Sequence, residues 1–288
     1  MIVLLLSIIC STYLVITFRI FKHFKIDMMQ GIVVNYITCV ITGMIVSGAV
    51  PSAQIIYEDW FPFAAFLGCM FFFIFNMMAF VAANIGVTLT SVASKLSMAI
   101  PVTVAIYLYD QEITIVKLLG LLLAIVAVYL TSVTPDEKKH ALHTRGLLLA
   151  LIIFIGSGIN DSIVNYAFAK LLTAEEFNVF NITIFGIAAT AGSIALIYRG
   201  IFLHKRPDWK AVVGGILLGI PNFFSMYFLL KALNIPGWES SVIFPVNNMG
   251  IVVLTAFCGW LLFREHLSRI NIAGIVIALL SIALMIIA

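Results

Sequence analysis

The feature that most constrains this chain is a series of apolar runs, each about as long as a lipid bilayer is thick. A helix needs about 20 apolar residues to cross the hydrocarbon core. Charged residues make up only 10% of the chain, against about 25% in soluble domains, and the mean hydropathy is +1.16. So few charges cannot cover a water-facing surface, so the sequence predicts an all-α integral membrane protein. Its ten expected helices occupy roughly residues 1–20, 29–49, 60–83, 88–109, 113–132, 146–170, 178–198, 210–232, 239–263 and 269–287.

The first apolar run is expected to be retained as a helix. It lacks the basic start and the small-residue cleavage site that mark a signal peptide. The four cysteines also lie within apolar runs, so neither a disulfide framework nor a metal cluster is expected.

The chain repeats itself at an offset of 150 residues. Asn84-Ile85, followed by Ser91-Val92, recurs as Asn234-Ile235 followed by Ser241-Val242. The repeat divides the chain into five helices in residues 1–134 and five in residues 145–288, joined by a polar seam. Because five is an odd number, the second half must enter the membrane from the opposite side. We therefore predict two inverted five-helix repeats.

The basic residues predict the orientation, because Lys and Arg accumulate in cytoplasmic loops. Three lysines fall on one side of the expected helices: Lys117, Lys170 and Lys231. Twelve basic residues fall on the other: Arg19, Lys22, Lys25, Lys138, Lys139, Arg145, Arg199, Lys205, Arg206, Lys210, Arg264 and Arg269. We expect the basic loops in the cytoplasm, both termini outside it, and the protein in the inner (plasma) membrane of the cell.

Each half closes with a glutamate, a short polar stretch, a glycine and a last apolar run. The first half reads Tyr107-Leu108-Tyr109-Asp110-Gln111-Glu112 before Gly120, and the second Trp260-Leu261-Leu262-Phe263-Arg264-Glu265 before Gly274. With ten helices in two halves, the chain resembles the EamA-like branch of the drug/metabolite transporter superfamily. The resemblance implies transport through a central cavity lined by the first, third, fourth, sixth, eighth and ninth helices. The two glutamates are interpreted as capping or topology elements.

Two charged residues lie near the middle of expected membrane helices, Lys95 and Asp161. A charge there costs roughly 2.5–3.5 kcal/mol and marks a functional site unless it is paired. An ion pair between the two is one interpretation, although their expected depths differ by about 9 Å. The other is a wet cavity, in which Lys95 binds a carboxylate or phosphate and Asp161 binds an ammonium group or carries a coupling proton.

Polar side chains recur at helical spacing around these charges, and residues three or four apart share a face. We expect them to bind substrate, against the alternative that they only hold helices together. They are Ser94, Asn76, Asn160, Asn165, Asn222, Ser225, Asn247 and Asn248. Pro101, Pro221 and Pro245 are candidate hinges, against ordinary helix curvature. Gly215 and Gly219 are interpreted as a close helix-packing pair.

These features predict a secondary active or facilitative transporter that moves a small polar metabolite, such as an amino acid, sugar or organic acid, by alternating access. The alternatives are a flippase for lipid-linked sugars or polyprenyl phosphates, and a multidrug exporter. The chain has no phosphate-binding GxxxxGK[ST] loop, Asp-rich prenyl-transferase motif or HExxH motif, so we expect no enzyme, cofactor, metal or nucleic-acid partner. The expected partners are a small-molecule substrate and the bilayer, with a homodimer left open.

Overall fold

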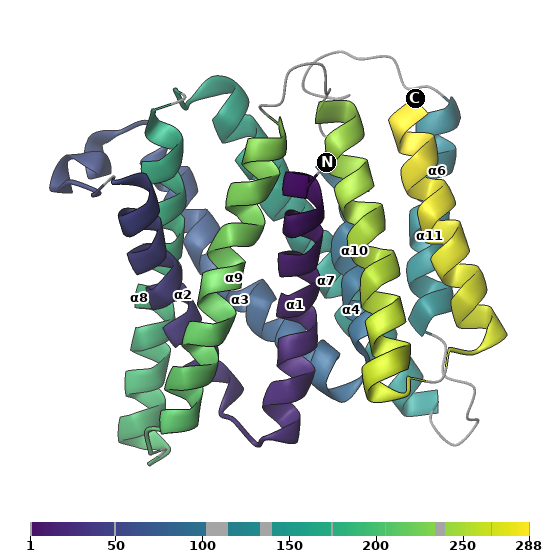
Figure 1. Cartoon of the computed structure of the whole chain (residues 1–288), viewed down its shortest axis with the longest axis horizontal. Helices are drawn as coiled ribbons and strands as arrows, with labels where there is room; N and C mark the ends of the chain where they lie inside the picture. The colour runs from purple at the N-terminus through teal and green to yellow at the C-terminus, as the bar shows by residue number, and fades with distance from the viewer. Residues whose placement is uncertain are drawn as a thin grey trace. The chain divides into compact units, whose positions relative to one another are not determined.

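The computed structural model describes residues 2–48, 50–101, 115–132, 140–173, 175–204, 206–233, 240–265 and 267–287 (Figure 1). Within these ranges every regular element is a helix. They are α1 (Ile2–His23), α2 (Met28–Ser47), the short 3₁₀ helix η1 (Ala53–Tyr57), α3 (Phe61–Asn84), α4 (Val87–Leu96), α6 (Ile115–Ser132), α7 (His140–Lys170), α8 (Glu176–Phe202), α9 (Trp209–Leu233), α10 (Ser240–Phe263) and α11 (Arg269–Ile287).

Length and apolar composition allow seven of the described helices to cross a membrane. The apolar stretches 118–131 in α6 and 269–284 in α11 are shorter. This supports a multi-pass membrane protein, and every one of the ten expected runs contains a helix.

The fourth expected helix, roughly 88–109, has an interruption within its described part, 88–101. Helix α4 ends at Leu96, Ser97 and Met98 form a turn, and helical backbone resumes at Ala99. The cause is local. The Ser97 hydroxyl donates to the Ser94 carbonyl, an acceptor that a continuous helix would use for its own backbone. Pro101 has no N–H to offer the Ser97 carbonyl, which instead accepts from the Ile100 amide at 2.9 Å.

The chain divides into two compact units. Unit 1 comprises residues 1–19, 77–159 and 225–288, and unit 2 comprises residues 20–76 and 160–224. Helices α1, α3, α7 and α9 each contribute residues to both units. Figure 1 shows that α1 begins and α11 ends at the same end of unit 1.

In unit 1, α6 packs along α11 and α4 along α10 (Figure 1). The α6–α11 pair is antiparallel. Near one end the Asn271 amide donates to the Leu130 carbonyl at 3.1 Å, and near the other the Ser281 hydroxyl donates to the Gly120 carbonyl at 2.7 Å. Buried alanines on both helices, including Ala124 and Ala278, bring the two together.

In unit 2, α2 packs against both α8 and α9. Its contact with α9 is close enough for backbones to touch. A Cβ added at Gly215 would lie 2.6 Å from the Gly31 carbonyl oxygen, and one at Gly219 would lie 2.7 Å from that of Asn35. The predicted role of these two glycines in close helix packing is therefore confirmed.

Candidate functional site

Helix α4 in unit 1 carries Lys95 in its last turn. The helix has ten residues, or about 15 Å at 1.5 Å per residue, half of a bilayer core about 30 Å thick. Lys95 and Ser94 are half-buried, just before the turn at Ser97. A cation in a last helical turn is favoured by the negative end of the helix dipole. The break and the lysine therefore lie together.

The first turn of α4 is held by Glu265, which follows α10. The Glu265 carboxylate accepts from the Val87 amide at 2.8 Å and from the Thr88 hydroxyl at 2.9 Å. A Cβ at Gly259 would lie 2.7 Å from the same carboxylate, so the glycine leaves room for it. An anion at a helix N-terminus satisfies open N–H groups and the helix dipole. The predicted capping role of Glu265 is confirmed, whereas Glu112 lies outside the described residues.

Arg19 of α1 performs the opposite role at the end of α3. Its guanidinium donates to the Ala83 carbonyl at 3.0 Å and more weakly to that of Ala82, at 3.5 Å. The guanidinium also lies 5.9 Å from the centre of the Phe263 ring. Arg19 therefore lies at the C-terminus of α3 and Glu265 at the N-terminus of α4. Each charge is opposite in sign to the helix dipole at that end.

The contact between α4 and α10 is antiparallel and brings repeat-related residues together. The Asn248 amide donates to the Met98 sulfur at 3.4 Å, and these two positions are 150 residues apart. Three turns away, a Cβ at Gly259 would lie 2.9 Å from Val87. On the two helices Ser91, Thr255 and Asn247 are buried, and their side-chain oxygens have no hydrogen-bond partner among the described residues.

Unit 2 has a buried polar cluster that joins the predicted Asn222 to Asn35, a residue that the sequence analysis did not single out. Asn35, in the middle of α2, is fully buried, and its side-chain oxygen accepts from the Asn222 amide at 3.1 Å. The Asn35 side-chain nitrogen has no partner among the described residues. One turn further, the Cys39 thiol donates to the Gly219 carbonyl at 3.4 Å. Asn35 could have been found from the sequence, because it is an asparagine within a largely apolar run, as Asn76 is.

The remaining predicted residues of unit 2 lie on α3 and α7. Asp161 is exposed, whereas its neighbour Asn160 is buried and its side-chain oxygen has no partner among the described residues. Asn76 donates to the Phe72 carbonyl of its own helix at 2.7 Å. Asn165 belongs to α7, but its side chain lies outside the described residues. Lys95 belongs to unit 1 and Asp161 to unit 2. An ion pair between them therefore stays a prediction, as does the alternative of a wet cavity.

Ser225 and the three prolines complete the predicted set. The Ser225 carbonyl accepts from the Ser7 hydroxyl at 2.9 Å, which joins α9 to α1 within unit 1. Pro221 lies inside α9, beside Asn222. Pro245 falls within α10, which continues through it, and Pro101 follows the break after α4. Of the three, Pro101 accompanies an interruption of the helix.

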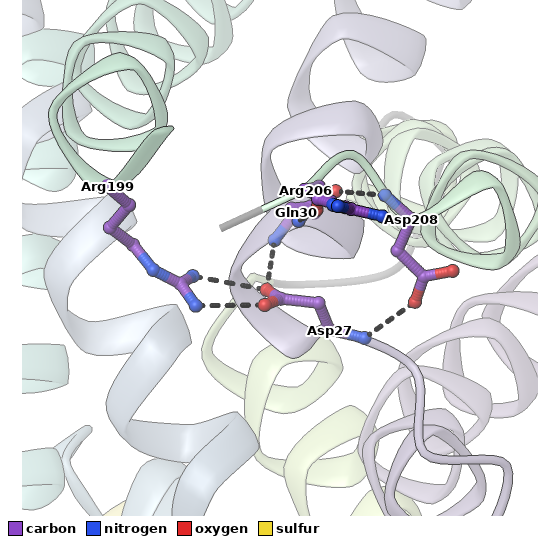
Figure 2. A network of polar contacts seen from close by, with 5 residues as sticks. All are labelled: Asp27, Gln30, Arg199, Arg206 and Asp208. Carbon is purple, nitrogen blue, oxygen red and sulfur yellow. Dashed lines mark hydrogen bonds and ion pairs between the residues drawn. The ribbon is translucent and has the colours of Figure 1, made fainter. Parts of the chain in front are cut away.

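A second polar network joins the ends of α2, α8 and α9 in unit 2 (Figure 2). Asp27 caps α2 by accepting from the Gln30 amide at 3.0 Å, and Arg199 of α8 donates both terminal nitrogens to its carboxylate at 3.1 and 2.8 Å. Asp208 accepts from the Asp27 amide at 3.1 Å and from the Lys210 amide at 3.0 Å. The Asp27 carboxylate is therefore bound by the N-terminus of α2 and by Arg199. The Asp208 carboxylate is bound by backbone amides at the starts of α2 and α9.

Two comparisons with known proteins found similarity to this chain. The model of the EamA-like transporter family matches residues 144–287, which is half of the chain. A protein of Haemophilus influenzae, itself described as uncharacterised, is 26% identical over 286 residues, covering 97% of this chain and 95% of its own length. The chain belongs to the EamA-like transporter family.

Proposed function

We propose that this membrane transporter carries a small polar metabolite by alternating access, with residues 1–134 and 145–288 as inverted five-helix halves. The observation that carries the proposal is the packing of three pairs of helices. The repeat offset relates α2 to α8, α4 to α10 and α6 to α11, and each helix packs against its own repeat partner. All three pairs are visible in Figure 1.

The direction of these pairs supports inversion. A Cβ at Gly43 would lie 2.9 Å from Ile182, while Asp27, an N-terminal neighbour of the same helix, binds Arg199. As the residue number rises along α2 it therefore falls along α8, so the pair is antiparallel. The α4–α10 and α6–α11 pairs behave alike. Halves related by a twofold axis in the membrane plane would produce this arrangement. The Met98–Asn248 contact, between residues one repeat apart, would then lie on that axis.

The broken helix favours substrate binding beside Lys95. Transporter sites lie near the bilayer midplane, where interrupted helices present charges and free backbone groups. Lys95 precedes such an interruption, and its ammonium has three donors for a carboxylate or phosphate. In unit 2, Asp161 is the candidate for binding an ammonium group or carrying a coupling proton.

The proposal is tested in two steps with purified protein. A thermal-shift screen against amino acids, sugars and organic acids identifies a ligand, whose uptake into proteoliposomes is then measured. We expect Lys95→Ala to reduce uptake about 100-fold, since it removes the proposed charged hydrogen bond to the substrate, worth up to about 3 kcal/mol. The matched control is Lys170→Ala, which changes an exposed lysine at the end of α7. Wild-type uptake by well-folded Lys95→Ala protein would contradict the assigned role.

A further inference from the structure

We propose that the end of unit 2 formed by the last turn of α1, the starts of α2 and α9 and the end of α8 is a docking surface for anionic phospholipid headgroups. We call it the basic face. Its defining members are four exposed cations: Lys22, Lys25, Arg206 and Lys210. The inference concerns the lipid environment and is independent of the transported substrate.

A short connection, a buried aromatic ring and an ion pair hold these helix ends together. Only four residues separate the end of α1 from the start of α2. Phe21 is buried where a Cβ at Gly214 would lie 2.9 Å from its ring, which fixes the end of α1 against α9. The Asp27–Arg199 ion pair, at 2.8 Å, fixes the end of α8 beside the start of α2.

The basic face has a net positive charge, because its five cations (the four defining members and Arg199) outnumber its two carboxylates, Asp27 and Asp208. Asp27 is engaged by Arg199 and by its own helix, and Asp208 by the Asp27 amide (Figure 2). The Lys210 amide also donates to Asp208. Arg206 takes part in this network through its backbone carbonyl, which accepts from the Gln30 side chain at 3.0 Å, so its guanidinium is not used there. The remaining cations offer charge complementarity to a negatively charged leaflet.

Exposed aromatic side chains place the same face at the level of lipid headgroups. Phe24 is 59% exposed, Phe202 64% and Trp209 71%. Each lies within one residue of a helix end. Tryptophan and tyrosine at the ends of membrane helices settle at the boundary between hydrocarbon and water, as expected for Trp209. The neighbouring lysines and arginines are long enough to reach phosphate groups at that depth.

Two residues of the basic face have a backbone conformation that favours glycine. Lys25 and His204 follow the ends of α1 and α8 with φ of 55° and 53°, a conformation that glycine adopts most easily. At the other end of α2 the corresponding position is Gly48, with φ of 67°. On the basic face the strained positions hold basic side chains instead.

The test measures thermal stability of the full-length protein in neutral detergent as dioleoylphosphatidylglycerol is titrated in, with dioleoylphosphatidylcholine as the neutral lipid. We expect phosphatidylglycerol to raise the melting temperature saturably and phosphatidylcholine to have little effect. Each removed cation should raise the half-saturating concentration about fivefold, so Lys22→Gln and Lys210→Gln together should raise it about 25-fold. Lys170→Gln, an exposed lysine at the end of α7, should leave it unchanged.

A second variant separates lipid binding from a folding defect. Lys25→Gly relaxes the backbone while removing a cation, so it should melt higher than wild type without anionic lipid and yet respond more weakly to phosphatidylglycerol. Equal responses of wild type and the Lys22/Lys210 double variant would overturn the proposal. So would an equal shift produced by free glycerol phosphate at the same concentration, because a soluble anion without acyl chains would then suffice.

Discussion

At the scale of single residues, Glu265 belongs to a short sequence signature and caps the N-terminus of α4 in the structure. The glutamate that closes the second half extends its carboxylate across to the first turn of α4, in the first half. The two glycines that approach it, Gly86 and Gly259, leave space that side chains would fill. The carboxylate thus fixes the start of the helix that carries Lys95.

Glu265→Ala is expected to lower the free energy of unfolding by about 1–3 kcal/mol, because the Val87 amide loses its charged acceptor. Glu265→Gln keeps one acceptor oxygen and should lose less. The measurement is reversible unfolding in mixed micelles, followed by tryptophan fluorescence. Glu175→Ala is the matched control, since Glu175 is exposed and its side chain makes no capping bond. Equal losses in Glu265→Ala and Glu175→Ala would show that the cap contributes nothing.

At the scale of elements, membrane solvation explains why most helices could be predicted. A chain in hydrocarbon must satisfy its backbone internally, so apolar runs of suitable length become helices. The turn after α4 departed from this because Ser97 and Pro101 change the local backbone bonds. Both residues are visible in the sequence, but a continuous helix with a proline kink is equally compatible with them.

The hydrogen-bond partners of polar side chains were harder to predict, because they depend on which helices pack against each other. Asn222 was chosen as a site residue, whereas Asn35, which accepts its hydrogen bond, was not. Their meeting requires α2 and α9 to approach closely, which Gly215 and Gly219 permit. Spacing along one helix indicates a polar face but not what that face contacts.

The close approach of α2 and α9 can be tested with one methyl group. A Cβ at Gly219 would lie 2.6 Å from Thr38 and 2.7 Å from the Asn35 carbonyl oxygen. We expect Gly219→Ala to destabilise unit 2 by about 1–3 kcal/mol, the range for overpacking, in the same unfolding assay. Gly200→Ala in α8, where a Cβ would meet nothing within 4 Å, should cause no loss. Wild-type stability of Gly219→Ala would mean that the two backbones are not in contact.

At the scale of the whole molecule, the repeat has a consequence that depends on whether it is inverted. Tyr57 of η1 and Pro207, between α8 and α9, are both exposed and lie 150 residues apart, at equivalent positions of the two halves. Inverted halves would place them on opposite sides of the membrane, and parallel halves on the same side. The basic residues near Pro207, among them Arg206 and Lys210, favour the cytoplasm for that position.

Single cysteines at these positions distinguish the two arrangements. In a background without the four native cysteines, Tyr57→Cys should react with a membrane-impermeant maleimide added to intact cells. Pro207→Cys should react only after the membrane is permeabilised. Each variant serves as the other's control, because the two differ in sidedness and not in exposure. Labelling of both from outside, or of neither, would contradict inverted halves and remove the basis for alternating access about a central twofold axis. If the two positions are labelled from opposite sides, the two repeats are inserted in opposite directions. This would explain why α2 packs antiparallel on α8.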